Sequence, residues 1–320
     1  MKGRTVALAA LGSLALAGCG GAAMSTTTSA ARPGTRAAKP ATRPRPAPKP
    51  KPTGPPVPRV ASGALGPGAT SGFIPAVRLN GQTAVWVART AGGVALLSFD
   101  QRLVTLHLHS GTIDAGSAGW RFGPAVVGGE RRRLVAAFNG GFRLNVGVGG
   151  FESYGKVGAP VKPGLGSIVT YSDGTTDVGT WRNAVPAPGK KVVSVRQNLT
   201  LLVNHGVAAS STGCLSCWGA TLSGVVDPAR SALGVTPDGR LIWAGGEKLT
   251  VAGLAQALVE AHVVRAVELD INPEWVAAYV YRHSGAHGPV TPIPVMPGQQ
   301  GIPGEFLTPW SRDFFTIAAR

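Results

Sequence analysis

The chain has 320 residues with 31 Lys and Arg, 15 Asp and Glu, and a formal net charge of +16. Ten of the basic residues and none of the acidic ones lie in the first sixty positions, which leaves 21 basic and 15 acidic side chains in the remainder. Because the excess charge lies in a stretch without interleaved aromatic residues, the composition excludes nucleic acid as a partner. It favours attraction to anionic lipid or wall polymers.

Residues 1–18 have the pattern of a lipoprotein signal peptide. Lys2 and Arg4 precede a small-residue apolar run that is too short to span a bilayer. The run ends in Leu16-Ala17-Gly18-Cys19, which resembles the lipobox of bacterial lipoproteins. We therefore predict cleavage before Cys19, and an extracytoplasmic protein that is lipid-anchored to the cell membrane through that residue. An ordinary secretory signal with an incidental cysteine is the alternative.

Residues 19–72 are predicted to form a disordered tether rich in Pro, Lys and Arg. The segment has too little apolar surface to offset the entropy of backbone ordering. Its dense prolines favour an extended polyproline II conformation of about 3 Å per residue. Such a spacer would hold a domain on the order of 100 Å from the membrane, a distance that suits a cell wall.

Residues 73–320 are predicted to form one α+β domain, mostly antiparallel β-sheet with one main helix packed on it. Hairpin turns are predicted at Gly92-Gly93 and at Asp100-Gln101. The basic cluster Arg131-Arg132-Arg133 is interpreted as a solvated turn. Apolar runs bounded by turn residues predict strands at residues 85–88, 94–99, 103–109, 134–138, 167–171, 176–181, 199–203 and 314–318.

Residues 230–272 predict two strands, a helix and a third strand. Residues 231–236 and 241–244 are joined by the turn signal Pro237-Asp238-Gly239. Thr250 is a candidate N-cap for a helix at residues 251–263, whose apolar positions recur at helical spacing. The third strand is predicted at residues 266–271.

This third strand carries two carboxylates, Glu268 and Asp270. Side chains alternate along a strand, so both would lie on one face, roughly 6–7 Å apart. At that distance like charges raise one another's pKa, which suits a division of general-acid and general-base work. The alternative is structural: one carboxylate in solvent and the other paired with an arginine such as Arg230.

Asn139-Gly140-Gly141-Phe142 follows a predicted strand. Its two glycines allow a sharp turn and close approach of the backbone to a ligand. Asn139 offers a donor and an acceptor for sugar hydroxyls or a phosphate. An Asn-Gly pair after a strand is also typical of an ordinary turn, so this motif alone does not define a site.

Four motifs, taken in order, resemble the phosphodiester glycosidase family: AAFNGGF at residues 136–142, RSALGV at 230–235, DGRLIW at 238–243 and LTVAGLAQALVEAHVVRAVELD at 249–270. The resemblance covers roughly residues 85–270, with a weaker echo at 311–317. It implies a mixed α+β fold and hydrolysis of a sugar-1-phosphodiester at its glycosidic bond. It also implies functional roles for Asn139, Gly141, Arg230, Gly234 and Asp270.

The chain departs from the family after the last strand. The family has Asn-Leu-Asp followed by glycines and a serine, whereas this chain has Glu268-Leu269-Asp270 and then a turn containing Pro273 and Trp275. Proline makes that turn rigid and removes an amide donor. A changed substrate and a loss of catalysis are both consistent with this difference.

Cys214 and Cys217 form the only cysteine pair once Cys19 is assigned to lipid. Outside the cytoplasm such a pair predicts a structural disulfide rather than a redox or zinc site. The histidine pairs 107/109 and 283/287 lack a carboxylate or cysteine at fixed spacing, so we predict no metal site from them. No cofactor is expected from the sequence, which leaves metal dependence and oligomeric state open.

These features support a hydrolase hypothesis. Asp270 would be the acid/base or nucleophilic carboxylate with Glu268 as its partner, and Arg230 would bind the phosphate. Asn139 and the amides of Gly140 and Gly141 would hold the sugar-phosphate or wall-glycan substrate. Two alternatives remain at this stage: a non-catalytic binding protein for sugar phosphates or wall glycopolymers, and a scaffold protein with a vestigial cleft.

Overall fold

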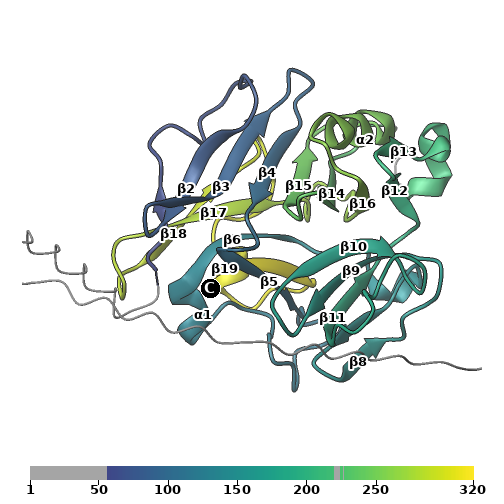
Figure 1. Cartoon of the computed structure of the whole chain (residues 1–320), viewed down its shortest axis with the longest axis horizontal. Helices are drawn as coiled ribbons and strands as arrows, with labels where there is room; N and C mark the ends of the chain where they lie inside the picture. Colours follow the sequence, from purple (N-terminus) through teal and green to yellow (C-terminus); the bar gives the residue numbers. More distant parts are fainter. Residues whose placement is uncertain (1–55, 220–223, 226) are drawn as a thin grey trace, which may run out of the picture. The chain divides into compact units, whose positions relative to one another are not determined.

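The computed structural model describes residues 56–219, 224–225 and 227–320 (Figure 1). Contacts within the chain group residues 51–320 into one unit, and all elements below belong to it. The predicted signal peptide and Cys19 lie outside the described residues. No helix in the described part of the chain is long and apolar enough to cross a membrane.

The described residues are largely β and form three antiparallel sheets, with far less helix than an α+β fold suggests. Sheet I has nine strands in the order β1 (Arg59–Val60), β2 (Ile74–Leu79), β3 (Gln82–Arg89), β4 (Ala95–Phe99), β15 (Leu241–Gly246), β14 (Arg230–Val235), β16 (Arg265–Glu268), β12 (Leu201–Asn204) and β13 (Val207–Ala208). Sheet II has the order β18 (Val290–Pro294), β17 (Ala278–His283), β6 (Leu134–Asn139), β19 (Phe314–Ala319) and β5 (Val104–His109). Sheet III has the order β10 (Thr176–Thr180), β9 (Gly166–Tyr171), β11 (Val192–Gln197), β7 (Phe151–Ser153) and β8 (Lys156–Ala159).

The helices are few. They are α1 (Gly128–Arg133), α2 (Val251–Glu260) and the short 3₁₀ turns η1 (Leu144–Val146), η2 (Ser210–Gly213), η3 (Leu215–Trp218) and η4 (Glu305–Leu307). The predicted order of strand, strand, helix and strand at residues 230–272 is confirmed as β14, β15, α2 and β16. Thr250 caps α2 as predicted, because its hydroxyl accepts a hydrogen bond from the amide of Gly253 at 3.0 Å.

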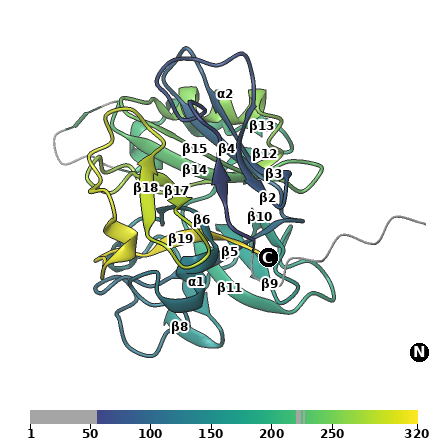
Figure 2. The ribbon, with the colours of Figure 1, turned by 90° about the vertical axis from the view of Figure 1, so that its left-hand side faces the viewer.

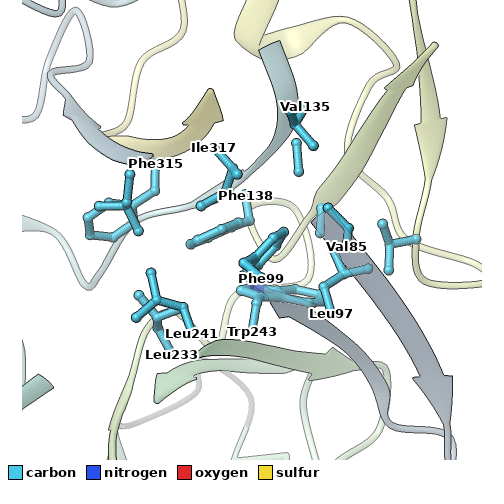
Figure 3. Close-up of a cluster of buried hydrophobic side chains, with 14 of the residues drawn as sticks. Val85, Leu97, Phe99, Val135, Phe138, Leu233, Leu241, Trp243, Phe315 and Ile317 are labelled. Carbon is cyan, nitrogen blue, oxygen red and sulfur yellow. The ribbon is translucent and has the colours of Figure 1, made fainter. Parts of the chain in front are cut away.

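Alternation along the strands of sheet I buries both of its faces. One face, with Ile242 and Ala244, packs against Leu254 and Leu258 of α2. The other face contributes to the main core, where aromatic side chains from sheets I and II meet (Figure 3). In the ribbon view of Figure 2, β6 and β19 of sheet II are drawn below β14 and β15 of sheet I. The Phe138 ring of sheet II lies with its centroid 6.1 Å from those of Phe99 and Trp243 of sheet I. These contacts tie β6, and therefore the turn that follows it, to the strands of sheet I.

Two predictions about local structure were wrong. Asp100-Gln101 is a corner and not a hairpin turn, because β4 belongs to sheet I and β5 to sheet II. The Gln101 side chain stabilises this corner by donating to the carbonyls of Thr176 and Gly239. The cluster at residues 131–133 is the last turn of α1, where Arg131 donates to the carbonyl of Leu307.

The boundary expected after residue 72 lies too late in the chain. β1 pairs with β2, and Ala64 is buried in the main core. The guanidinium of Arg89 also binds the carbonyls of Leu65 and Gly66. Part of the expected tether is therefore integrated into the folded domain. The strands β1, β2, β7, β8, β11, β13, β17 and β18 were not predicted. Four of them, β1, β7, β8 and β13, have only two to four residues, which is too short for an apolar pattern to be recognised.

Candidate functional site

The turn after β6, the start of β14 and the segment after β16 meet at one end of sheet I. Asn139 and Asp270 are linked there through Ser231: the Asn139 amide donates to the serine hydroxyl at 2.9 Å, and the Asp270 backbone N–H donates to the same oxygen at 3.4 Å. The antiparallel pairing of β14 with β16 produces this meeting, because it brings the start of one strand to the end of the other. The structure therefore brings Asn139 beside the backbone of Asp270.

β16 ends at Glu268, three residues before the predicted end of that strand. The Asn198 side chain explains the difference, since its amide donates to the carbonyls of both Glu268 and Leu269 at 2.8 and 2.7 Å. Two carbonyls that a regular strand would offer to a neighbour are thus bound by one side chain. Asp270 therefore lies outside the strand, ahead of the turn at residues 273–275, and its side chain lines a cavity.

Asp270 is 4% exposed and tightly held. Its Oδ1 accepts hydrogen bonds from the amides of Ile271 at 2.7 Å and Asn272 at 2.9 Å, and its Oδ2 lies 3.3 Å from Nη2 of Arg312. Burial raises the pKa of Asp270 to about 6, although Arg312 and the two amides oppose that rise. A carboxyl group with this pKa can change its protonation state close to neutral pH.

Arg312 was not predicted, and it contacts most of the site. Its Nε pairs with Asp114, its Nη2 also donates to the carbonyl of Gly141 at 3.0 Å, and its guanidinium lies 4.0 Å from the ring centroid of Trp275. The weak similarity at residues 311–317 was the only sequence signal for it. Asp114 had none, because an isolated aspartate in a Gly-rich loop is common in sequences.

Asp270 lines a cavity of about 490 Å³, a volume typical of small-molecule sites. Arg143 lies on the same wall, with its guanidinium 5.5 Å from the ring centroid of Trp275. Its Nε is buried and has no hydrogen-bond partner among the described residues. The other lining residues are Phe142, Val146, Val148, Leu199, Ser216, Gly219, Ile271, Asn272 and Trp275.

A second cavity of about 390 Å³ adjoins the first, and Arg143 lines both. Its other lining residues include Asp114 and Asn145, which give it a more polar wall. Asp114 also accepts a hydrogen bond from the amide of Leu144 at 3.2 Å. The two cavities are therefore separated by one short segment, η1 and the arginine that precedes it.

Glu268 and Arg230 lie away from the cavity and bind each other. Their Oε1 and Nη1 atoms are 2.7 Å apart, and both side chains are almost completely buried. Arg230 also donates to the carbonyls of Leu249 and Trp218. Burial raises the pKa of Glu268, and the guanidinium opposes that rise. The pairing of Glu268 with Arg230 agrees with the structural alternative, but the other carboxylate, Asp270, is buried and not in solvent. Neither Glu268 nor Arg230 lines the Asp270 cavity.

The three candidate glycines are required by packing. A Cβ atom on Gly140 would lie 2.0 Å from Oδ2 of Asp313, and one on Gly141 would lie 3.0 Å from the Arg196 guanidinium. Asp313 and Arg196 are themselves a buried ion pair at 2.7 Å. The amide of Gly140 donates to the backbone carbonyl of Asp313, so it already has a partner within the protein. A Cβ atom on Gly234 would lie 2.4 Å from a methyl group of Val263, beneath α2.

Cys214 and Cys217 are joined in a disulfide, as predicted. The loop that it closes contributes Ser216 to the cavity wall, and Gly219, two residues after the disulfide, lines the same cavity. His107 and His109 both contact one oxygen of Glu130, at 2.8 and 3.1 Å. In the part of the chain that the structure describes, no group of three or more His, Cys, Asp or Glu side chains has an arrangement that could hold a metal ion.

No protein-family model matches the chain, and a search of curated proteins finds no match. Three solved structures are similar over most of the chain. The catalytic domain of zebrafish N-acetylglucosamine-1-phosphodiester alpha-N-acetylglucosaminidase, auto-inhibited by its pro-peptide, is 15% identical with a TM-score of 0.45, over 83% of this chain and 88% of the zebrafish domain. A hypothetical protein from Synechocystis is 14% identical with a TM-score of 0.44, over 75% of this chain and 63% of that one. A putative exported protein from Burkholderia pseudomallei is 12% identical with a TM-score of 0.34, over 76% of each chain.

Proposed function

We propose that this protein is a cell-surface lipoprotein that hydrolyses the glycosidic bond of sugar-1-phosphodiesters. The observation that carries the proposal is the position of Asp270. This buried carboxylate lines a ligand-sized cavity together with Arg143, whose Nε has no hydrogen-bond partner among the described residues. A carboxylate that is held by two amides and a cation has the geometry of a reacting group rather than of a surface charge.

The proposed roles differ from those that the sequence suggested. Arg143 replaces Arg230 as the phosphate-binding residue, since Arg230 is bound to Glu268 and to two carbonyls. Arg312 positions Asp270 and keeps it ionised above about pH 6. Asn139 acts through Ser231, which it holds against the backbone of Asp270.

The proposed reaction is a displacement at the anomeric carbon. Asp270 accepts a proton from a water molecule as the water oxygen bonds to that carbon. The bond from the carbon to the bridging oxygen breaks, and the phosphate monoester leaves with the electron pair, stabilised by Arg143. The products are the free sugar and the phosphate monoester.

The test is hydrolysis of a panel of sugar-1-phosphodiesters by the full chain, with release of free sugar as the readout. Asp270→Asn should abolish turnover without lowering the melting temperature by more than a few degrees. Asp173→Asn, which changes an exposed carboxylate far from the cavity, should leave turnover unchanged. If no member is cleaved, the hydrolase proposal fails.

The second candidate is a sugar-phosphate or wall-glycopolymer binding protein. Pro273 and Trp275, in place of a flexible glycine turn, favour it. Saturable binding of uncleaved panel members would support this alternative.

A further inference from the structure

The cavity beside Asp270 is mostly apolar. Among the described residues that line it, six have large apolar side chains and two are charged, Arg143 and Asp270. Sugar hydroxyls buried against such walls would lack hydrogen-bond partners, and each unpaired group would cost free energy. The six are Phe142, Val146, Val148, Leu199, Ile271 and Trp275.

Trp275 is not freely available as a stacking platform for a sugar ring. The guanidinium of Arg312 lies over it at 4.0 Å from the ring centroid, and that of Arg143 lies 5.5 Å from it. Val146, at the rim, is 58% exposed, so the apolar lining continues to the surface of the protein. An open apolar channel that begins at a cation is complementary to an amphiphile with an anionic head.

We infer that the cavity binds an aliphatic chain, and that the substrates are sugar-1-phosphodiesters of long-chain alcohols. This inference rests on the proposed function for the sugar, but the chain-binding step can be measured without catalysis. Arg143 would hold the phosphate between the two cavities, because it lines both and its Nε has no partner in the described residues. The anomeric carbon would lie beside Asp270, at the charged end of the cavity. The sugar hydroxyls would extend toward the more polar cavity with Asp114 and Asn145, since Arg312 contacts both Asp270 and Asp114.

The experiment is calorimetric titration of the full chain with methyl, butyl and octyl phosphate. The protein is kept in lipid nanodiscs, because detergent would compete for an apolar cavity. Each buried methylene should tighten binding about fourfold, so octyl phosphate should bind at least about a hundredfold more tightly than methyl phosphate. Equal affinities for the three ligands would overturn the inference.

Two matched variants test where the aliphatic chain binds. Val146→Asn should weaken octyl phosphate at least tenfold and leave methyl phosphate unchanged. Val207→Asn, at a valine that is 67% exposed and does not line the cavity, should change neither affinity. Equal effects of the two variants would show that the aliphatic chain of octyl phosphate partitions into lipid or binds elsewhere on the protein. That result would also overturn the inference.

Arg143→Ala should weaken all three ligands by a similar factor, since the phosphate is common to them. Failure of the two proposals can be told apart. If affinity depends on chain length but no panel member is hydrolysed, the aliphatic-chain site is sustained and the hydrolase proposal, with the substrate assignment that rests on it, is rejected. Hydrolysis at rates that do not depend on the length of the aliphatic chain would support the hydrolase proposal and reject the aliphatic-chain site.

Discussion

Arg312 connects the charged groups of the candidate site. It contacts Asp114, the carbonyl of Gly141 and Asp270, and it covers Trp275. A cation beside a buried carboxyl group stabilises the ionised form, and it therefore limits the rise in pKa that burial causes. The protonation state of Asp270 is thus controlled by a residue 42 positions later in the chain.

The pH dependence of kcat/KM tests this control. Asp270 must be ionised to accept a proton, so kcat/KM should rise as the pH passes about 6. Arg312→Met removes the cation, favours the neutral carboxyl group and should move the rising limb to higher pH. Arg312→Lys retains a cation and should keep the limb close to its original position.

Arg240→Met is the control for this experiment, because it removes a partly exposed arginine that pairs with Asp238. It should leave the pH profile unchanged. A limb that stays at the same pH in Arg312→Met would mean that the titrating group is not Asp270.

Substitution of Gly140 by alanine tests how tightly the turn after β6 is packed. A Cβ atom there would lie 2.0 Å from a carboxylate oxygen of Asp313 and 2.6 Å from its backbone oxygen, and the backbone oxygen cannot move away by rotation of a side chain. Gly140→Ala should therefore destabilise the protein by about 2–4 kcal/mol in denaturant unfolding. Gly213→Ala, at an exposed glycine with open space around it, should change the stability by less than about 0.5 kcal/mol.

At the scale of elements, residues 230–272 form the part of the fold that positions Asp270. α2 buries Leu254 and Leu258 on one face of sheet I, and its start is stabilised by Thr250. Because α2 connects β15 to β16, its packing determines where β16 begins. The register of β16 against β14 in turn brings Asp270 to Ser231.

The cap of α2 gives a prediction at this scale. Thr250→Ala removes the hydroxyl that accepts from the Gly253 amide, and should lower the free energy of unfolding by about 1 kcal/mol. Thr250→Ser retains the acceptor and should be close to neutral. Equal losses in the two variants would indicate that the threonine methyl group, and not the cap, is responsible.

The first described segment, residues 56–72, gives another prediction at the scale of elements. Deletion of residues 20–55 should leave the melting temperature unchanged, because their composition offers little apolar surface to pack. Deletion of residues 20–72 also removes β1, Ala64 and two carbonyls that bind Arg89, and should lower the melting temperature by several degrees. Identical melting curves would restore the boundary at residue 72.

At the scale of the whole molecule, the sequence predicts a leader and a basic tether before the folded domain. The first sixty residues carry no acidic side chain, whereas the domain contains buried ion pairs such as Arg196–Asp313 and Arg230–Glu268. If the chain is anchored as predicted, the candidate site acts on substrates outside the cytoplasm.

Anchoring is tested at Cys19. Cys19→Ala should move the protein from the membrane fraction to the medium, or leave it as an unprocessed precursor. Mass spectrometry of the wild-type protein should find a mature chain that begins at a lipid-modified Cys19. A mature chain with another first residue and no lipid would contradict the prediction.

Short sequence patterns correctly predicted the turns, caps and helices that depend only on neighbouring residues. The turn at residues 237–239, the cap at Thr250 and the apolar periodicity of α2 all act within a few residues, and the structure has all three. The disulfide is local as well, since its cysteines are three positions apart. The proximity of Asn139 to Asp270 was expected only from the family resemblance.

The sequence by itself determined the composition of the leader and tether, the arrangement of residues 230–272 and the acidic character of the segment around Asp270. Only the tertiary structure decided which arginine meets which carboxylate. Arg230 is closer to Asp270 in sequence than Arg312 is, yet Arg230 binds Glu268 and Arg312 binds Asp270. The reason is that such pairs depend on the order of strands in sheets I and II and on which face each strand end presents, and no pattern of neighbouring residues encodes that order.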